Sequence, residues 1–499
     1  MKPNILILMT DQQRWDLRKS RGYSLDTMPF LDSWAKGGVD FDRAYTPCPT
    51  CMAARVCMFT GRYAESHRVR TNHNAEDALY SEDMLEFLKT KDYAAALCGK
   101  NHSHHPEKDF DFAETSGHLG HEGNWKPSSE AEETFAKFMD ETRHMESNTP
   151  SPGGIEVQHP YRNVSSAFKF IDSKPKEKPF FLWLSFAEPH NPYQVPEPYF
   201  DLFPPESLPP LKTGPEALAS KGHKFSWIRN VWEKVLGPDI DKRIQRVRSN
   251  YHGMLRFIDD QFKRLIEGLD SRNLLENTIV IFISDHGDFA GEYGLIRKGP
   301  DLPEVLTRIP FAVRGPGIKA QGINNEACVS IVDIFPTICG ILGEEIPFGV
   351  QGKSILPILK GDQYPKKEFE TAYSESGFGG LYWNENDDLD LAKEGACPPD
   401  GKPLAFDELN SWTQCGQVRM VRKGRYKIQL DMLGTGYLYD LETDPQEVKN
   451  LFADPAYITV KADMLKELSA AMLRAMDPIP APRRRYHYKA HAMGYWFGD

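Results

Sequence analysis

Three cysteines lie within ten positions of the stretch TPCPTCMAARVCMFTGRY, which covers residues 46–63. Cys48 and Cys51 have the spacing of half a zinc site, but the remaining cysteines are isolated and form no second pair at matching spacing. A redox C-x-x-C pair normally opens a helix after a strand, whereas prolines flank Cys48 on both sides. Both interpretations are disfavoured. The feature left to explain is Cys51, with Arg55 about one helical turn further on.

Polar side chains follow four short apolar runs elsewhere in the chain. Asp11 and Gln12 follow the first run, and the others are followed by Lys100 and His102, by His190, and by Asp285 and His286. A divalent cation prefers oxygen ligands, which Asp11, Asp285 and the Gln12 carbonyl can supply, and His286 can add a nitrogen. One aspartate after a strand is usually a cap or turn residue. Four coincidences of this kind favour a common site.

The elements that must position these residues alternate between strands and helices. The apolar runs at 4–9, 94–98, 180–186, 278–283 and 311–313 are typical of buried strands, and 81–90 and 248–269 have helical spacing. This alternation predicts an α/β fold in which a large mixed, mostly parallel sheet is sandwiched by helices. Ligands bind at the carboxyl ends of the strands in such sheets. The polar residues above lie at those ends.

The residue composition and pattern of the chain change after about residue 360. An acidic, polar stretch covers 384–403, strand-like alternation follows at 417–430 and 436–445, and 458–476 has helical spacing. We predict a catalytic domain over residues 1–362. A smaller C-terminal α+β domain over 363–499 would contain an antiparallel sheet, a helix and a basic, aromatic tail.

Composition excludes several classes of protein. The net charge of −11 argues against a nucleic-acid partner, because such proteins carry a basic excess. Eight cysteines in 499 residues are too few for a disulfide scaffold. The apolar run at 5–9 is too short for a signal peptide or a membrane span, and no other segment reaches 18 apolar residues. We expect no membrane partner and a cytoplasmic location, or a periplasmic one if a leader has been removed.

The sequence of Cys51-Met52-Ala53-Ala54-Arg55, followed by Thr60-Gly61-Arg62, resembles the signature of type I, formylglycine-dependent sulfatases of the alkaline phosphatase-like superfamily. The other motifs of that family follow in order. They are Asp11-Gln12, the box Gly99-Lys100-Asn101-His102, His190 in SFAEPHNPY, ISDHGD at 283–288 and Lys298 in GLIRKGP. The segment YLYDLETDPQEVKNL at 437–451 is similar to the family's second domain.

The resemblance implies a cofactor made from the chain itself. A maturase would oxidise Cys51 to formylglycine, and Ala53 is typical of substrates of the anaerobic radical maturase. The implied metal ligands are Asp11, Gln12, residue 51, Asp285 and His286; we expect Ca²⁺, with Mg²⁺ or Mn²⁺ as alternatives. In the implied mechanism the aldehyde hydrate attacks sulfur. Arg55 holds the hydrate, Lys100 and Lys298 bind sulfate oxygens, His190 assists the leaving oxygen, and His102 removes the proton that lets sulfate depart.

The substrate is the least determined part of this hypothesis. Long insertions at 103–160 and 377–412 carry Trp125, Trp383 and Trp412 beside polar groups, a mixture that suits sugar rings. We therefore expect a small sulfated substrate, in particular a saccharide, contacted by Arg70, Asn72, His104 and His105. His118 and His121 lie in the same loop as His104 and His105; loop histidines are usually solvated, but this loop follows the box at Lys100, so substrate contact stays open for them as well. A surface or subunit contact is the alternative for the insertions, and the sequence does not set the oligomeric state.

Two other functions stay open. One is a phosphonate monoester or phosphodiester hydrolase that shares the fold and the formylglycine, and the other is a non-catalytic carbohydrate-binding homologue. Relatives of the first kind tend to lack the box at 99–102, which is intact here.

Overall fold

The computed structural model describes residues 2–379, 386, 416–476 and 493–497. Its centre is an eight-stranded sheet with the strand order β4-β3-β5-β1-β6-β7-β2-β8. The strands are β1 (Asn4–Asp11), β2 (Val39–Tyr45), β3 (Ala94–Gly99), β4 (Phe112–Thr115), β5 (Phe180–Pro189), β6 (Thr278–Ser284), β7 (Phe311–Arg314) and β8 (Gly322–Ser330). All five predicted strands are present.

The sheet is mixed but mostly parallel, which confirms the predicted class. β1 pairs in parallel with β5 and β6, and β3 pairs in parallel with β4 and β5. Only β7 runs against its neighbours, β6 and β2, while β2 and β8 are parallel to each other. The carboxyl ends of β1, β3, β5 and β6 therefore lie along one edge of the sheet.

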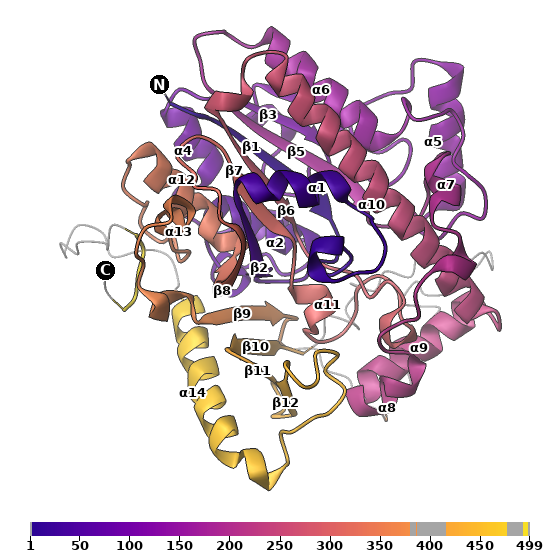
Figure 1. Ribbon diagram of the computed structural model, residues 1–499, viewed down its shortest axis with the longest axis vertical. Helices are drawn as coiled ribbons and strands as arrows, with labels where there is room; N and C mark the ends of the chain where they lie inside the picture. The colour runs from indigo at the N-terminus through magenta and orange to yellow at the C-terminus, as the bar shows by residue number, and fades with distance from the viewer. Residues whose placement is uncertain (1, 380–385, 387–415, 477–492, 498–499) are drawn as a thin grey trace.

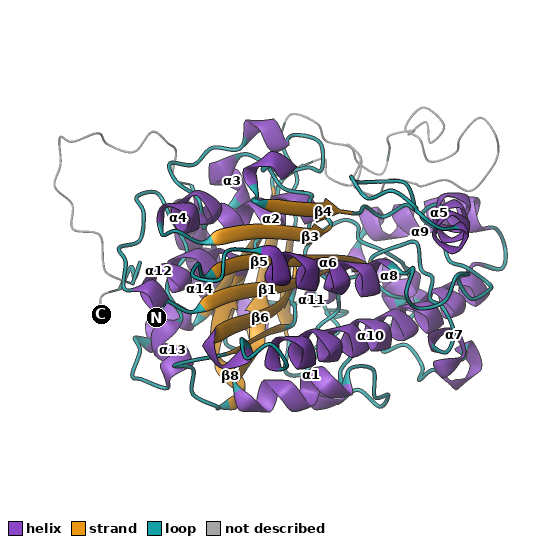
Figure 2. Ribbon diagram, turned by 90° about the horizontal axis from the view of Figure 1, so that it is seen from above, coloured by secondary structure: helices purple, strands orange, loops and turns teal. Residues whose placement is uncertain are grey.

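Helices cover both faces of this sheet (Figure 2). Leu6 and Leu8 of β1 face a core built with α1 (Pro29–Trp34), α6 (His159–Ser173), α9 (His223–Leu236) and α10 (Ile240–Asp270). Ile5, Ile7 and Met9 face the opposite core, built with α2 (Cys51–Thr60), α4 (Met84–Thr90), α12 (Ile334–Leu342) and α13 (Leu356–Lys360). Because successive side chains of a strand point to opposite faces, a continuous apolar run is what a doubly covered strand needs.

A second, four-stranded antiparallel sheet lies beside the first (Figure 1). It consists of β9 (Thr371–Ser376), β10 (Val418–Lys423), β11 (Tyr426–Asp431) and β12 (Gly436–Asp440) in the order β12-β11-β10-β9. Helix α14 (Ile458–Ala475) buries Met464 and Leu468 against Val421, Ile428 and Leu438 of this sheet. The predicted antiparallel sheet and helix are both present, and the boundary at residue 362 stays a prediction.

The remaining helices are α3 (Ala64–His67), α5 (Glu130–Thr142), α7 (Tyr199–Leu202), α8 (Leu218–Lys221) and α11 (Glu304–Thr307). The insertion predicted at 103–160 contains β4 and α5. Most of the acidic stretch at 384–403, Trp383, Trp412 and most of the basic tail lie outside the described residues. Within the described ranges, no helix is both long enough and apolar enough to cross a membrane.

Candidate active site

Cys51 is the first residue of α2, a helix whose ten residues are all buried. Thr50 precedes it in an extended conformation, and Gly61 ends the helix in the left-handed region at φ 63°. A Cβ at Gly61 would come within 2.7 Å of Cγ1 of Val350, so glycine meets both the conformational and the steric requirement. The amino end of a helix carries partial positive charge. Residue 51 is thus held rigidly at the helix end that carries this partial positive charge.

The sulfur of Cys51 lies close to three other functional groups. It is 3.2 Å from Nε2 of His286, 3.3 Å from Nζ of Lys298 and 3.6 Å from Oδ1 of Asp11. Burial and the Asp11 carboxylate would raise the pKa of Cys51, but Lys100, Lys298 and His286 together lower it to about 6. A thiol with this pKa is mostly thiolate at neutral pH, which is the reactive form of cysteine.

Arg55, one turn along α2, clamps two buried carboxylates. Its Nη2 donates to Oδ2 of Asp11 at 2.9 Å, and its Nε donates to Oδ2 of Asp285 at 3.0 Å. Its Nη1 donates to Oγ of Ser185 at 2.7 Å. Burial would lower the pKa of Arg55, but the two carboxylates raise it. Arg55 is therefore a fixed cation that keeps Asp11 and Asp285 side by side.

Asp11 and Asp285 meet because β1 and β6 are parallel neighbours whose carboxyl ends coincide. Burial and the Asp11 carboxylate raise the pKa of Asp285, whereas Lys100, His190 and Arg55 hold the pKa of Asp11 well below its ordinary range despite burial. Together with Cys51 and His286, the two aspartates present ligand atoms that all lie within 4.8 Å of one another. Two carboxylates and an imidazole nitrogen that converge in this way fit a divalent cation, whose charge would offset the repulsion between the aspartates.

Gln12 is held by bonds to four partners. Its main-chain N–H donates to Oδ1 of Asp285 at 3.0 Å. Its Nε2 donates to Asp288, its Oε1 accepts from Nζ of Lys298 at 2.9 Å, and its main-chain carbonyl accepts from the hydroxyl of Tyr251 at 2.6 Å. The side-chain oxygen and the main-chain oxygen of Gln12 each accept a hydrogen bond already. The role of Gln12 as a metal ligand stays a prediction. Asp288, which the sequence analysis did not place in the site, also accepts from the Tyr193 hydroxyl at 2.8 Å. Its position three residues after Asp285 was the available signal.

Lys100, which follows β3, connects the aspartates to a group of histidines. Its Nζ donates to Asp11 and to Nε2 of His118, the latter at 2.7 Å. The His118 ring stacks on that of His190 with centroids 3.8 Å apart, and Nδ1 of His190 bonds the Asn191 carbonyl at 2.6 Å. His118 comes from the insertion at 103–160, and only the folding of that segment brings it here. No local sequence signal distinguishes it from the other loop histidines.

His102 is the nearest of these histidines to Lys100 in the sequence. Burial, Lys100 and Arg55 hold its pKa well below the ordinary value, so its imidazole is neutral. In the described part of the chain, its Nδ1 is buried without a hydrogen-bond partner. A neutral imidazole with a free nitrogen can accept a proton, as the resemblance requires.

Two pairs of residues predicted to bind substrate have different surroundings. His104 and His105 both bond Asp83, the N-cap of α4, and their rings contact Phe59 at the far end of α2 from Cys51. Both histidines are thus bonded to Asp83 at the start of α4, and their contact with substrate stays a prediction. Asn72, in contrast, accepts from the main-chain N–H of Met52 at 3.1 Å, one residue from the nucleophile. Arg70 lies in the same loop and pairs with Glu65 at 3.5 Å.

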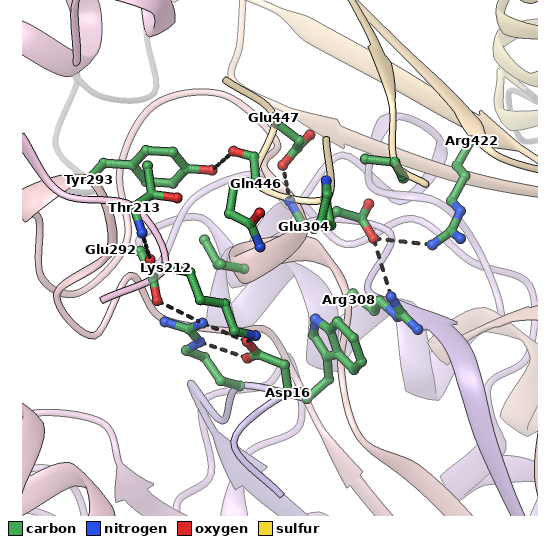
Figure 3. Close-up of a pocket in the computed structure, with 15 residues that line it drawn as sticks. Asp16, Lys212, Thr213, Glu292, Tyr293, Glu304, Arg308, Arg422, Gln446 and Glu447 are labelled. Carbon is green, nitrogen blue, oxygen red and sulfur yellow. Dashed lines mark hydrogen bonds and ion pairs between the residues drawn. The ribbon is translucent and has the colours of Figure 1, made fainter. Parts of the chain in front are cut away.

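A second group of buried charges, the Glu304 cluster, lies between α11 and the small sheet (Figure 3). Its charged members line a cavity of about 200 Å³ and are Arg14, Asp16, Lys212, Glu292, Glu304, Arg308, Arg422 and Glu447. Glu304 accepts from Lys427 at 3.1 Å and from Arg422 at 3.2 Å. Among the described residues, every charged side chain of this cavity has an oppositely charged partner. None of the predicted site residues lines it.

Comparison with known proteins agrees with this geometry. The family model described as Sulfatase matches residues 3–344. An arylsulfatase of Clostridium perfringens is 26% identical over 486 residues, which cover 92% of each chain. Among solved structures, the phosphonate monoester hydrolase of Agrobacterium radiobacter matches with a TM-score of 0.75 at 22% identity, covering 95% of this chain and 96% of that one. A protein solved with its substrate D-glucosamine-2-N,6-O-disulfate matches with a TM-score of 0.66 at 19% identity, covering 95% and 98%.

Proposed function

This chain belongs to the sulfatase family, and on that premise we propose that it hydrolyses a sulfate ester carried by a small saccharide. Membership makes it a sulfuric ester hydrolase. The observation that carries the proposal is the position of Cys51, whose sulfur lies within 3.6 Å of Asp11, His286 and Lys298 at the head of a buried helix. The choice of a saccharide is supported by the neighbour whose substrate is a disulfated glucosamine.

Two groups would complete the site. Formylglycine, made from Cys51 by a maturase, would supply the hydroxyl that attacks sulfur. A divalent cation, for which we propose Ca²⁺ with Mg²⁺ or Mn²⁺ as alternatives, would be held by Asp11, Gln12, residue 51, Asp285 and His286. When bound, such a cation acidifies a neighbouring hydroxyl and offsets charge on sulfate oxygens.

Three other side chains would stabilise the transition state or position the aspartates. Lys298 and Lys100 place two ammonium groups near residue 51, where charge develops on the sulfate oxygens. Arg55 holds the carboxylates of Asp11 and Asp285 side by side. These groups are held by buried hydrogen bonds before substrate arrives, which is the condition for electrostatic stabilisation of a transition state.

His190 and His102 are suited to proton transfer. Nδ1 of His190 is bonded to a main-chain carbonyl, which leaves Nε2 to face the leaving oxygen. Burial, Lys298 and Lys100 hold the pKa of His190 well below its ordinary value. A bound sulfate ester would offset the two lysines and favour the protonated imidazole needed for general acid catalysis. Neutral His102 is the corresponding base.

The proposal is tested by maturation and turnover together. After co-expression with a maturase, mass spectrometry of the peptide containing residue 51 should show aldehyde in place of thiol. The matured protein should release sulfate from an aryl sulfate and from at least one member of a panel of O- and N-sulfated sugars. Turnover of aryl or alkyl sulfates alone would refute the saccharide assignment. Persistent thiol in the presence of an active maturase would refute the cofactor.

A second candidate function has one observation in its favour. The phosphonate monoester hydrolase matches this fold with a TM-score of 0.75, against 0.66 for the glucosamine-disulfate complex. Against it stand Lys100 and His102 at the site, the box that the resemblance associates with sulfate. An aryl phosphonate assayed beside an aryl sulfate decides between them, because the preferred ester should have the higher kcat/KM.

A further inference from the structure

An open groove of about 450 Å³ lies in the loop that follows the nucleophile helix. It is lined by Glu65, Arg68, Arg70, Thr71, Asn74 and Phe378. The first five belong to α3 and the loop after it, and Phe378 follows β9 of the small sheet. The groove therefore lies where the nucleophile's loop meets the second sheet.

Two contacts connect this groove to the nucleophile. Asn72, between the lining residues Thr71 and Asn74, accepts from the main-chain N–H of Met52 at 3.1 Å. Arg70 also lines a small space with Cys48, three residues before Cys51. The loop that forms the groove is thus hydrogen-bonded to the first turn of α2, next to residue 51.

The groove is positively charged although the protein carries a net charge of −11. Arg68 is exposed, and in the described ranges no carboxylate pairs with it. Glu65 lies 3.5 Å from Arg70 but bonds Arg419 more closely, at 2.6 Å. Glu375 also faces Arg419, at 3.4 Å, and Asp77 accepts from the amide of the lining residue Asn74 at 3.0 Å. Arg70 and Arg419 therefore share Glu65 and Glu375, and among the described residues no carboxylate pairs with Arg68.

The remaining lining groups shape the groove for a sugar ring. Thr71 and Asn74 bond each other and the main chain of their loop and so fix the shape of the groove, and Phe378 provides an apolar ring for one face of a pyranose. Arginine is the side chain best suited to bind sulfate or carboxylate, because its planar fork donates two parallel hydrogen bonds.

We propose that this groove binds the sugar of the substrate and that Arg68 and Arg70 bind a second anionic group on it, a sulfate or a carboxylate. The inference rests on the proposed function and narrows it: the preferred substrate is a saccharide with at least one negative charge besides the ester that is cleaved.

The test compares substrates on the matured, metal-loaded enzyme. The kcat/KM for sulfate release is measured on a neutral monosulfated sugar, on the same sugar with a second sulfate, and on a monosulfated uronate. The wild type should prefer one of the two doubly charged sugars, and which one it prefers distinguishes sulfate from carboxylate. In Arg68→Gln the preference ratio should fall at least about tenfold through KM, the size expected for a lost hydrogen bond between charged groups.

The control is Arg272→Ala, which removes a partly buried arginine paired with Asp172 just after the end of α10. It should leave the preference ratio unchanged. A neutral sugar turned over as well as the charged ones, or a ratio unchanged in both Arg68→Gln and Arg70→Gln, would overturn the inference.

Binding separates this inference from the proposed function. Calorimetry with Cys51→Ala measures affinity for the same sugars without turnover, with and without Arg68→Gln. If the matured enzyme releases sulfate from no ester, the proposed function fails, yet weaker binding of the doubly charged sugar in the double variant still supports the groove. Equal binding in both proteins overturns it.

Discussion

The nucleophile site and the Glu304 cluster are both built from buried charges, but they balance those charges differently. In the Glu304 cluster each charge meets its opposite, and burial is outweighed by Lys427 and Arg422, which lower the pKa of Glu304 to about 2. Around Cys51, groups of like charge are packed together. Asp11 and Asp285 share Arg55, and Lys100 and Lys298 both lower the pKa of Cys51.

The way buried charges are paired distinguishes a cluster that stabilises the fold from one that can perform chemistry. Paired charges that join two sheets act as a fastening, because removing one partner leaves the other buried without compensation. At the nucleophile site Arg55 pairs with both aspartates and Lys100 also pairs with Asp11, yet burial and Asp11 still raise the pKa of Asp285. A cation beside the aspartates and an anion beside the lysines would each meet opposite charge there. Perturbed pKa values at such a place are a sign of function.

Loss of the nucleophile should have the largest effect. Cys51→Ala removes the group that becomes formylglycine, so sulfate release should fall below detection while the thermal unfolding midpoint stays near that of the wild type. Cys57→Ala is the control: Cys57 lies on the same helix but contacts His67 at 3.1 Å, away from the site. Measurable turnover by Cys51→Ala under the same conditions would contradict the assignment.

The aspartate pair comes next. Asp11→Asn removes one of two carboxylates that face each other, and we expect a loss of about a hundredfold or more in the rate of sulfate release, since an element of this kind is worth about 3 kcal/mol. Bound metal, measured by elemental analysis, should fall in parallel. Asp172→Asn, on the surface beside Arg272, serves as control. Full wild-type activity after long incubation in excess chelator would rule out the metal.

The Glu304 cluster should respond in stability and not in activity. Glu304→Gln leaves Arg422 and Lys427 with fewer partners, and we expect the free energy of unfolding to fall by about 3 kcal/mol. Exposed Glu326, paired with Lys366, is the control; its change to Gln should cost less than about 1 kcal/mol. A large loss of turnover in a folded Glu304→Gln protein would abolish the distinction between the two clusters.

The same variant gives a pH dependence with a definite sign. The pKa of Glu304 is lowered from 4.5 to about 2 in the folded protein, so its stabilising effect is complete above its ordinary pKa. That effect is lost as the pH falls from 4.5 through 2. The stability difference between wild type and Glu304→Gln should therefore shrink on acidification over this range. A difference that grows would show that the carboxylate is not held by Lys427 and Arg422.

The sequence predicted the strands that carry the site because those strands are buried on both faces. β1, β3, β5 and β6 are unbroken apolar runs, and the polar residues that follow them lie at one edge because the strands are parallel. β2 was not predicted, since its sequence VDFDRAY mixes charges with apolar residues and the charges find partners only in the fold. The antiparallel direction of the four-residue β7 has no local signal.

The residues of the active site also divide into those that the sequence predicts and those that it does not. Asp11, Lys100, Asp285 and His286 could be predicted because each lies at or just after the end of a strand, and Arg55 because it lies one turn from Cys51 on a helix. His118 and the bonds of His104 and His105 to Asp83 depend on how the insertion after β3 folds back, which spacing does not encode. Residues fixed by secondary structure are readable from sequence, and residues fixed by a long loop are not.

The smallest effect concerns His118, which we expect to act as a positioning residue for Lys100. Its Nε2 accepts from Lys100 at 2.7 Å and its ring stacks on His190, so it fixes an ammonium that the Asp11 carboxylate alone would leave free to turn. His118→Ala should lower kcat about tenfold, as the loss of one charge-assisted hydrogen bond predicts, with KM nearly unchanged. His118→Gln should recover most of the loss, because an amide oxygen can accept from the same ammonium, whereas a packing role would not distinguish Gln from Ala in this way.

His121→Ala is the control, since His121 is exposed in the same loop and bonds Asp140. An unchanged kcat in His118→Ala would show that Asp11 alone positions Lys100, and the histidines would then not belong to the nucleophile site.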